Sequence, residues 1–143
     1  MTDAGRGAGR VVALDPGTAR IGVAVSDTAR HLAFPRPPLD AGAGEVARCA
    51  SLAIEEGATL VVVGHPLRLD GTEGPAAAHA DALATALREA LGPEGVEVVL
   101  HDERLTTVTA TSRLRSAGVG AREARGRVDG AAAVVLLESW MSA

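Results

Sequence analysis

Short apolar runs and a sharp turn mark the first part of this 143-residue chain. Residues 11–14 form a β-branched run, and in residues 21–25 apolar side chains alternate with small ones, so both stretches predict strands. Between them, Pro16-Gly17-Thr18 predicts a tight turn, because proline fixes φ and glycine accepts the positive φ that some turns require. We therefore predict an antiparallel hairpin with Asp15 at the end of its first strand.

The rest of the chain predicts one edge strand and then alternating helices and strands. Residues 31–37 contain prolines, which cannot donate to a β-ladder, so this strand is expected at a sheet edge. The continuous apolar run 60–63 predicts a strand covered on both faces. The remaining elements are expected as helices over 43–56, 75–91, 105–117 and 128–141, with a strand over 96–100 and a weakly patterned stretch at 118–127.

This order, β-β-β-α-β-α-β-α-α, indicates an α/β fold with a mixed five-stranded sheet and helices on both faces. The length suits a single domain over residues 10–143, after a Gly/Ala-rich leader over 1–9 that we expect to be disordered. The leader lacks the apolar core of a signal peptide, which predicts a cytoplasmic protein. Only Phe34 and Trp140 are aromatic, so alanine, valine and leucine must pack the core.

The cysteine content excludes some kinds of site, and the charge bears on whether the chain binds nucleic acid. The single cysteine, Cys49, excludes an intramolecular disulfide and a cysteine-rich zinc site, and we expect it to be a small core residue. The net charge of −4 is not that of a typical nucleic-acid binder. All 14 basic residues are arginines, however, and six of them gather in one late segment, where their planar guanidinium groups suit phosphate. These six are Arg104, Arg113, Arg115, Arg122, Arg125 and Arg127.

Four motifs occur in a fixed order along the chain. They are residues 14–27 (LDPGTARIGVAVSD), 63–67 with 70–74 (VGHPL and DGTEG), 102–107 (DERLTT) and 128–140 (VDGAAAVVLLESW). Together they resemble the YqgF/RuvX family over residues 10–141. Members of that family have a ribonuclease H-like fold, are related to the RuvC Holliday-junction resolvase, and are described as nucleases that mature the end of pre-16S ribosomal RNA.

The resemblance implies a metal-dependent endonuclease that matures the 5′ end of pre-16S rRNA with Mg²⁺ or Mn²⁺. Hard cations take oxygen ligands, and the family's acidic positions correspond here to Asp15, Asp129 and one residue of the pair Asp102-Glu103. Neighbouring strand residues face opposite sides, and Glu103 is favoured for its reach. We therefore expect Asp15, Glu103 and Asp129 as metal ligands, with Asp102 as the further catalytic candidate.

One feature of the motifs departs from the resolvases. RuvC-like resolvases carry an acid on the strand next to the first, whereas residues 60–63 run into Gly64 and His65. The pair Asp102-Glu103 is expected one strand further away, about 10 Å from the first strand. Asp27 and Asp70 are possible substitutes for the missing acid, although such residues more often cap turns. His65 is interpreted as incidental, and the other histidines show no metal-ligand spacing.

Phosphate contacts are expected from Arg20, Arg68, Arg104 and Thr106. With few aromatics for base stacking, the chain should bind nucleic acid through phosphates and therefore in a salt-dependent way. The leading hypothesis is an endonuclease of structured RNA, acting as a monomer or homodimer without a membrane partner. The alternatives are a dimeric resolvase of branched DNA, a non-catalytic nucleic-acid-binding module, and a nucleotide site of the sugar-kinase/actin type.

Overall fold

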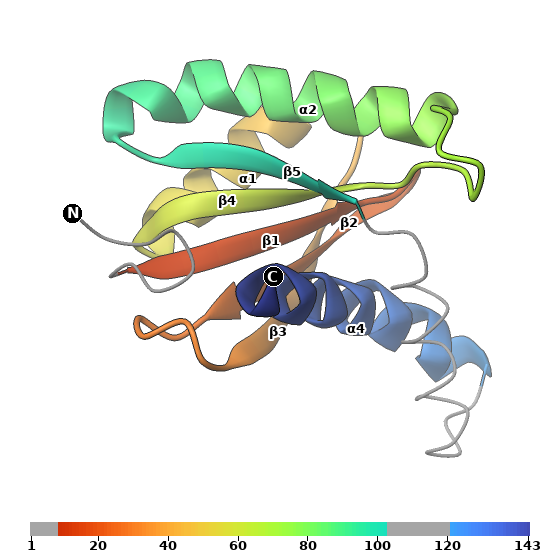
Figure 1. Ribbon diagram of the computed structural model, residues 1–143, viewed down its shortest axis with the longest axis horizontal. Helices are drawn as coiled ribbons and strands as arrows, with labels where there is room; N and C mark the ends of the chain where they lie inside the picture. Colours follow the sequence, from red (N-terminus) through yellow and green to blue (C-terminus); the bar gives the residue numbers. More distant parts are fainter. Residues whose placement is uncertain (1–8, 103–120) are drawn as a thin grey trace.

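The computed structural model describes residues 9–102 and 121–143, with side chains in the second range from Gly130 onward. Figure 1 shows a central sheet between two helical layers. The described elements are β1 (Arg10–Pro16), β2 (Arg20–Ser26), β3 (Ala33–Asp40), α1 (Glu45–Glu55), β4 (Ala58–His65), α2 (Pro75–Leu91), the 3₁₀ turn η2 (Gly92–Glu94), β5 (Glu97–Asp102) and α4 (Ala121–Ser142). No helix among these residues is long and apolar enough to cross a membrane.

The five strands form one mixed sheet in the order β3-β2-β1-β4-β5. β1 pairs antiparallel with β2 and parallel with β4, so the predicted hairpin and mixed sheet are confirmed. The proline-rich strand β3 lies at an edge, as predicted. Its run continues to Asp40 through Pro37 and Pro38, because an edge strand does not need every N–H for pairing.

The turn between β1 and β2 requires glycine. A Cβ built on Gly17 would lie 2.5 Å from the carbonyl oxygen of Arg20, a distance that real Cβ atoms essentially never show. The turn therefore brings the backbone of residues 17 and 20 into close approach, as the predicted tight turn implies. It sets the antiparallel register in which Asp15 pairs with Gly22.

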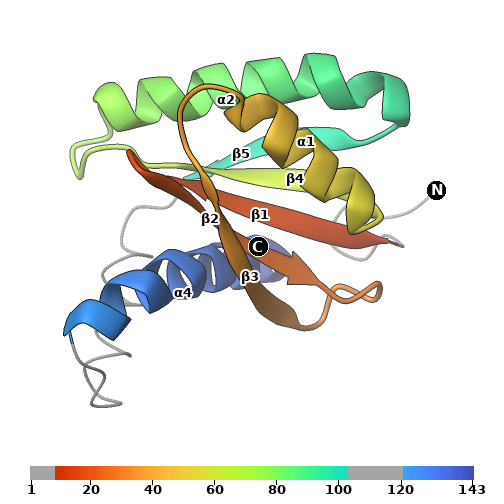
Figure 2. The same cartoon turned by 180° about the vertical axis from the view of Figure 1, so that it is seen from behind.

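Side-chain alternation along the strands gives the sheet two apolar faces. α1 and α2 cover one of them, which we name the α2 face and which carries Val12, Leu14, Val61 and Val63. α4 covers the other, the α4 face, which carries Val11, Ala13, Leu60 and Val62. Figure 2 shows the same two layers from behind. Helices on both faces are thus confirmed.

The inner surface of α4 consists of small and branched side chains. Ala133, Leu136 and Leu137 are fully buried against the α4 face, and the neighbouring Ala132 is buried as well. Trp140 packs against the same cluster, and the Arg30 guanidinium lies 5.9 Å from the centre of its ring. On the other face, Cys49 is buried, and burial raises the pKa of its thiol to about 12, so it is a core residue as expected.

The predicted start of the last helix was wrong. α4 begins at Ala121, whereas the apolar repeat placed the start at residue 128. Residues 121–127 contain no apolar side chain larger than alanine and include Gly126, so no apolar stripe marks the start of the helix. The predicted helix over 105–117 and leader residues 1–8 lie outside the described residues.

Glu56 links three elements just after the end of α1. Its carboxylate oxygens lie 3.1 Å from Arg10 Nη1 and 3.0 Å from Arg36 Nε, and its side chain is only 16% exposed. Arg36 holds the pKa of Glu56 below its usual value of 4.5 through its hydrogen bonds and its charge, and Arg10 contributes in the same two ways. The stabilisation from this carboxylate is therefore complete above about pH 4.5 and is lost as the pH falls through the lowered native pKa.

We expect Glu56→Gln to lower the free energy of unfolding at pH 7 by about 1 kcal/mol, because the exchange removes a charge-assisted pair. Urea denaturation at pH 7 and at pH 3 measures the difference from wild type, which should shrink at the lower pH. Glu55→Gln, at the exposed neighbouring position, is the matched control and should leave stability nearly unchanged. An equal loss at both pH values would contradict the assignment.

Candidate functional site

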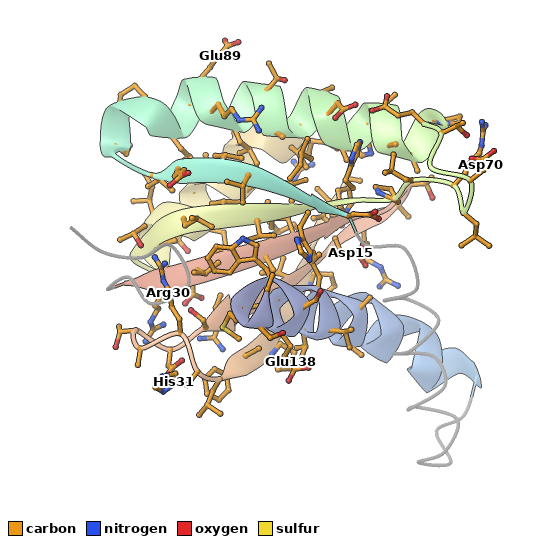
Figure 3. The ribbon with its side chains drawn as sticks, viewed as in Figure 1. Asp15, Arg30, His31, Asp70, Glu89 and Glu138 are labelled. Carbon is orange, nitrogen blue, oxygen red and sulfur yellow. The ribbon has the colours of Figure 1, made fainter. Side chains whose placement is uncertain are left out.

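Asp15 lies at the carboxyl end of the central strand β1 (Figure 3). Side chains alternate between the two faces along a strand, so Asp15 lies on the same face as Val11 and Ala13, which is the α4 face. On β2, the residue beside Asp15 is its register partner Gly22. On β4, Leu14 pairs with Val63, so the residue beside Asp15 is Gly64. Because neither glycine carries a side chain, the half-buried Asp15 carboxylate is flanked by two positions that hold only backbone.

His101 continues this row of residues across the sheet. It is the register partner of Gly64, and its Nε2 lies 3.0 Å from the Ser139 hydroxyl of α4, so its side chain is on the α4 face. Asp15 and His101 are separated by the strand β4, a lateral spacing of about 10 Å. The predicted separation between the first strand and the strand that leads into residues 102 and 103 is thus confirmed.

Asp102 lies on the opposite face from Asp15. It pairs with His65 and follows Val98 and Leu100, which pack on the α2 face. The structure therefore does not bring Asp102 together with Asp15. The same alternation favours Glu103 for the α4 face, but Glu103 lies outside the described residues, so the third acid stays a prediction.

The last acid, Asp129, belongs to α4, and its side chain is not among those described. It precedes the buried Ala133 by one helical turn, and Ala133 packs against the sheet. Of the predicted phosphate contacts, Arg20 is exposed at the start of β2, and Arg68 is exposed in the loop between β4 and α2. Arg104 and Thr106 lie outside the described residues.

Asp27 and Asp70 cap turns and do not substitute for a missing acid. The Asp27 carboxylate accepts hydrogen bonds from the backbone N–H groups of Leu32 at 2.9 Å and His31 at 2.7 Å. Asp70 accepts from the Thr72 hydroxyl at 2.7 Å and from the Thr72 N–H at 2.9 Å. These hydrogen bonds lower the pKa of both carboxyl groups. The interpretation as turn caps is confirmed.

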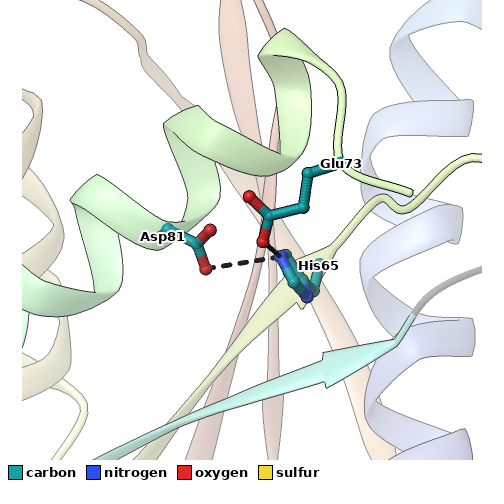
Figure 4. A group of neighbouring side chains, drawn as sticks. All are labelled: His65, Glu73 and Asp81. Carbon is teal, nitrogen blue, oxygen red and sulfur yellow. Dashed lines mark ion pairs between the residues drawn. The ribbon is translucent and has the colours of Figure 1, made fainter. Parts of the chain in front are cut away.

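A second polar cluster contains His65, which the sequence interpretation treated as incidental. His65 Nε2 lies 3.2 Å from Glu73 Oε2 and 3.3 Å from Asp81 Oδ1, as Figure 4 shows. The three residues come from the end of β4, the following loop and α2. Each is eight positions from the next, a spacing that matches no local metal-ligand motif, so periodicity alone could not reveal the cluster.

Comparisons with known proteins agree with this architecture. A family model described as "RuvX: Holliday junction resolvase" matches residues 9–143. A relative from Thermobifida fusca, named "Putative pre-16S rRNA nuclease", is 48% identical over 90% of this chain and 84% of its own length. A relative of the same name from Anaeromyxobacter dehalogenans is 45% identical over 92% of this chain and 96% of its own.

Solved structures support the fold. The structure titled "T. thermophilus RuvC in complex with Holliday junction substrate" has a TM-score of 0.56 at 16% identity, covering 93% of this chain and 96% of that one. The yeast mitochondrial Holliday junction resolvase Ydc2 has a TM-score of 0.54 at 11% identity, covering 94% and 78%. These neighbours confirm the predicted ribonuclease H-like fold. The family model that matches residues 9–143 and the relatives of 45–48% identity show that the chain belongs to the RuvX family.

Proposed function

We propose that this nuclease hydrolyses phosphodiester bonds of structured RNA and matures the 5′ end of pre-16S rRNA in the cytoplasm. The observation that carries the proposal is the position of Asp15. Its carboxylate lies at the end of the central strand, on the α4 face, between two glycine positions. The helix that covers this face, α4, carries Asp129.

The donor set suits divalent cations of the Mg²⁺ or Mn²⁺ class, because carboxylate oxygens are their preferred protein ligands. Asp15, Glu103 and Asp129 would hold them. When bound, such cations lower the pKa of an attacking water and offset charge on the phosphate. Asp15 is held by a buried strand, so its carboxylate is preorganised, and the adjacent Gly22 and Gly64 leave room for a phosphate to approach.

The described surface favours recognition of phosphates over recognition of bases. Of the two aromatic residues, Trp140 packs against the α4-face core with Arg30 over its ring, and Phe34, 42% exposed on the edge strand β3, is the single aromatic side chain available for stacking. Arg20 and Arg68, in contrast, are exposed. Binding through these guanidinium groups would weaken steeply as salt rises.

Resolution of branched DNA is the second candidate function. The description of the RuvX family and the fold shared with RuvC favour it. The strand next to β1 argues against it, because β4 ends in Gly64 and His65 instead of an acid. The names of the relatives favour RNA.

The test compares two substrates under matched conditions. A structured pre-16S rRNA fragment and a DNA four-way junction are incubated with wild type or Asp15→Asn, in Mn²⁺ or in EDTA. We expect cuts at the 5′ end of the 16S sequence that require Mn²⁺ and are lost in Asp15→Asn. Preferred cleavage of the junction would instead identify a resolvase.

A binding assay on the same samples separates catalysis from recognition. If wild type and Asp15→Asn both leave the substrates intact and bind RNA equally well, the catalytic proposal is wrong and the chain is a binding module. RNA binding in the range of 50 to 200 mM salt should fall steeply in either case. This salt series tests phosphate recognition independently of cleavage.

A further inference from the structure

We infer that His65, Glu73 and Asp81 form a binding site for Zn²⁺ that is separate from the Asp15 site. The three donor atoms come from β4, from the loop that follows it and from α2, and all lie within 4.8 Å of one another. Figure 4 shows both carboxylates directed at one side of the imidazole ring. A cation at this point would connect the strand end, the loop and the helix.

The distances to His65 fit tetrahedral ligation. Zinc bonds to nitrogen and oxygen ligands are about 2.0–2.1 Å long, which places neighbouring ligands of a tetrahedron about 3.3 Å apart. The observed separations from His65 Nε2 are 3.2 Å to Glu73 and 3.3 Å to Asp81. The side chains of Glu73 and Asp81 are 50% and 38% exposed, so they have the freedom to close the distance between their own oxygens.

Hydrogen bonding does not account for the position of the imidazole nitrogen. Nε2 of His65 is buried and has no hydrogen-bond partner of acceptable geometry in the described structure, although two carboxylate oxygens lie within 3.3 Å. An imidazole Nε2 carries at most one hydrogen, which can point at only one acceptor. A buried nitrogen that lies near two carboxylates and makes no hydrogen bond calls for an explanation, and a bound cation supplies one.

The donor set is one imidazole nitrogen and two carboxylates. Imidazole favours zinc over magnesium or calcium, and the two negative charges match a divalent cation. Three protein ligands leave a fourth tetrahedral position for water. The chain has a single, buried cysteine, so this site would be of the His/carboxylate type.

The site lies on the opposite side of the sheet from Asp15. His65 follows Val61 and Val63 in the alternation on β4, so it belongs to the α2 face, where its register partner is Asp102. Asp15 belongs to the α4 face. Zinc at His65 would therefore fix the loop between β4 and α2, which carries the exposed Arg68, without occupying the predicted catalytic position.

Metal binding by the full chain tests the site without an activity readout. Protein stripped with a chelator is titrated with ZnCl₂ by calorimetry and with CoCl₂ by visible absorption, which reports tetrahedral geometry. We expect one Zn²⁺ per chain, a tetrahedral Co²⁺ spectrum, and a rise in Tm of about 8 °C at a hundredfold excess over Kd. His65→Gln, Glu73→Gln and Asp81→Asn should each weaken binding at least about tenfold.

Two variants serve as controls. Asp15→Asn should bind Zn²⁺ like wild type, which separates this site from the proposed catalytic one. His31→Gln alters an exposed histidine at a turn and should also bind normally. Circular dichroism of each variant in EDTA confirms that it folds, and Glu73→Gln is the decisive ligand variant because its exposed side chain is the least needed for folding.

The proposal is overturned by three outcomes. Absence of Zn²⁺ binding by wild type would leave the cluster as an ion pair of His65 with two carboxylates. Binding that survives all three ligand variants would place the metal elsewhere. Binding lost in Asp15→Asn and retained in Glu73→Gln would assign the zinc to the acidic site on the α4 face.

Discussion

Exchange of Glu103 for glutamine is expected to reduce metal-dependent cleavage at least about a hundredfold, the usual cost of losing one group that stabilises the transition state. Exchange of Asp102 for asparagine should leave cleavage nearly unchanged. The reason is the alternation of side chains along β5. Asp102 lies on the α2 face with His65, whereas Asp15 lies on the α4 face. We expect Glu103, the next position, on the face of Asp15, because neighbouring residues of an extended chain face opposite sides.

The two variants form a matched pair, because each converts one carboxylate to its amide at adjacent positions. Initial rates of cleavage in Mn²⁺ measure the effect, with Asp15→Asn as the benchmark for a complete loss. Thermal unfolding of both variants should match wild type, so that a lost rate reflects chemistry. If Asp102→Asn lost as much activity as Asp15→Asn, the assignment of faces at the end of β5 would be wrong.

Truncation of Leu136 to alanine is expected to lower the free energy of unfolding by about 2–5 kcal/mol. Leu136 is fully buried in the cluster on the α4 face, against side chains of β1 and β4. Within the described ranges, α4 is the only helix that covers this face, and Leu136 is one of its fully buried side chains there, so the truncation leaves a cavity between helix and sheet. The expected fall in Tm is about 5–15 °C.

Urea denaturation of Leu136→Ala and of Leu69→Ala measures this contribution. Leu69 is 79% exposed in the loop before α2, so its truncation should change stability by less than about 0.5 kcal/mol. Equal losses in the two variants would contradict the packing of α4 on the sheet. Cleavage by Leu136→Ala, measured well below its Tm, would then report whether α4 also holds Asp129 in position.

Local sequence patterns predicted most of the architecture. The turn at Pro16-Gly17-Thr18 predicted the hairpin, and the close approach of Gly17 to the Arg20 carbonyl gives the physical reason. The prolines of β3 predicted its edge position, because they cannot complete a ladder. The start of α4 was missed, because residues 121–127 contain no apolar side chain larger than alanine and therefore show no apolar stripe.

Only part of the candidate site was predicted from the sequence. The position of Asp15 at a strand end and the turn-capping roles of Asp27 and Asp70 were predicted from short-range patterns and are confirmed. The assignment of Asp102 and Asp15 to opposite faces required the observed register of three strands. The cluster of His65, Glu73 and Asp81 required the fold as well, because its members lie on three different elements.

Local sequence determined which segments become strands, helices and turns, because those preferences depend on backbone sterics and on hydrophobic period within a few residues. It also identified the acidic motifs through their order along the chain. Strand register and helix packing decided which polar groups share a face of the sheet. A single-residue change of register moves a side chain to the other face, so no local pattern could have separated Asp102 from Asp15 or joined His65 to Asp81.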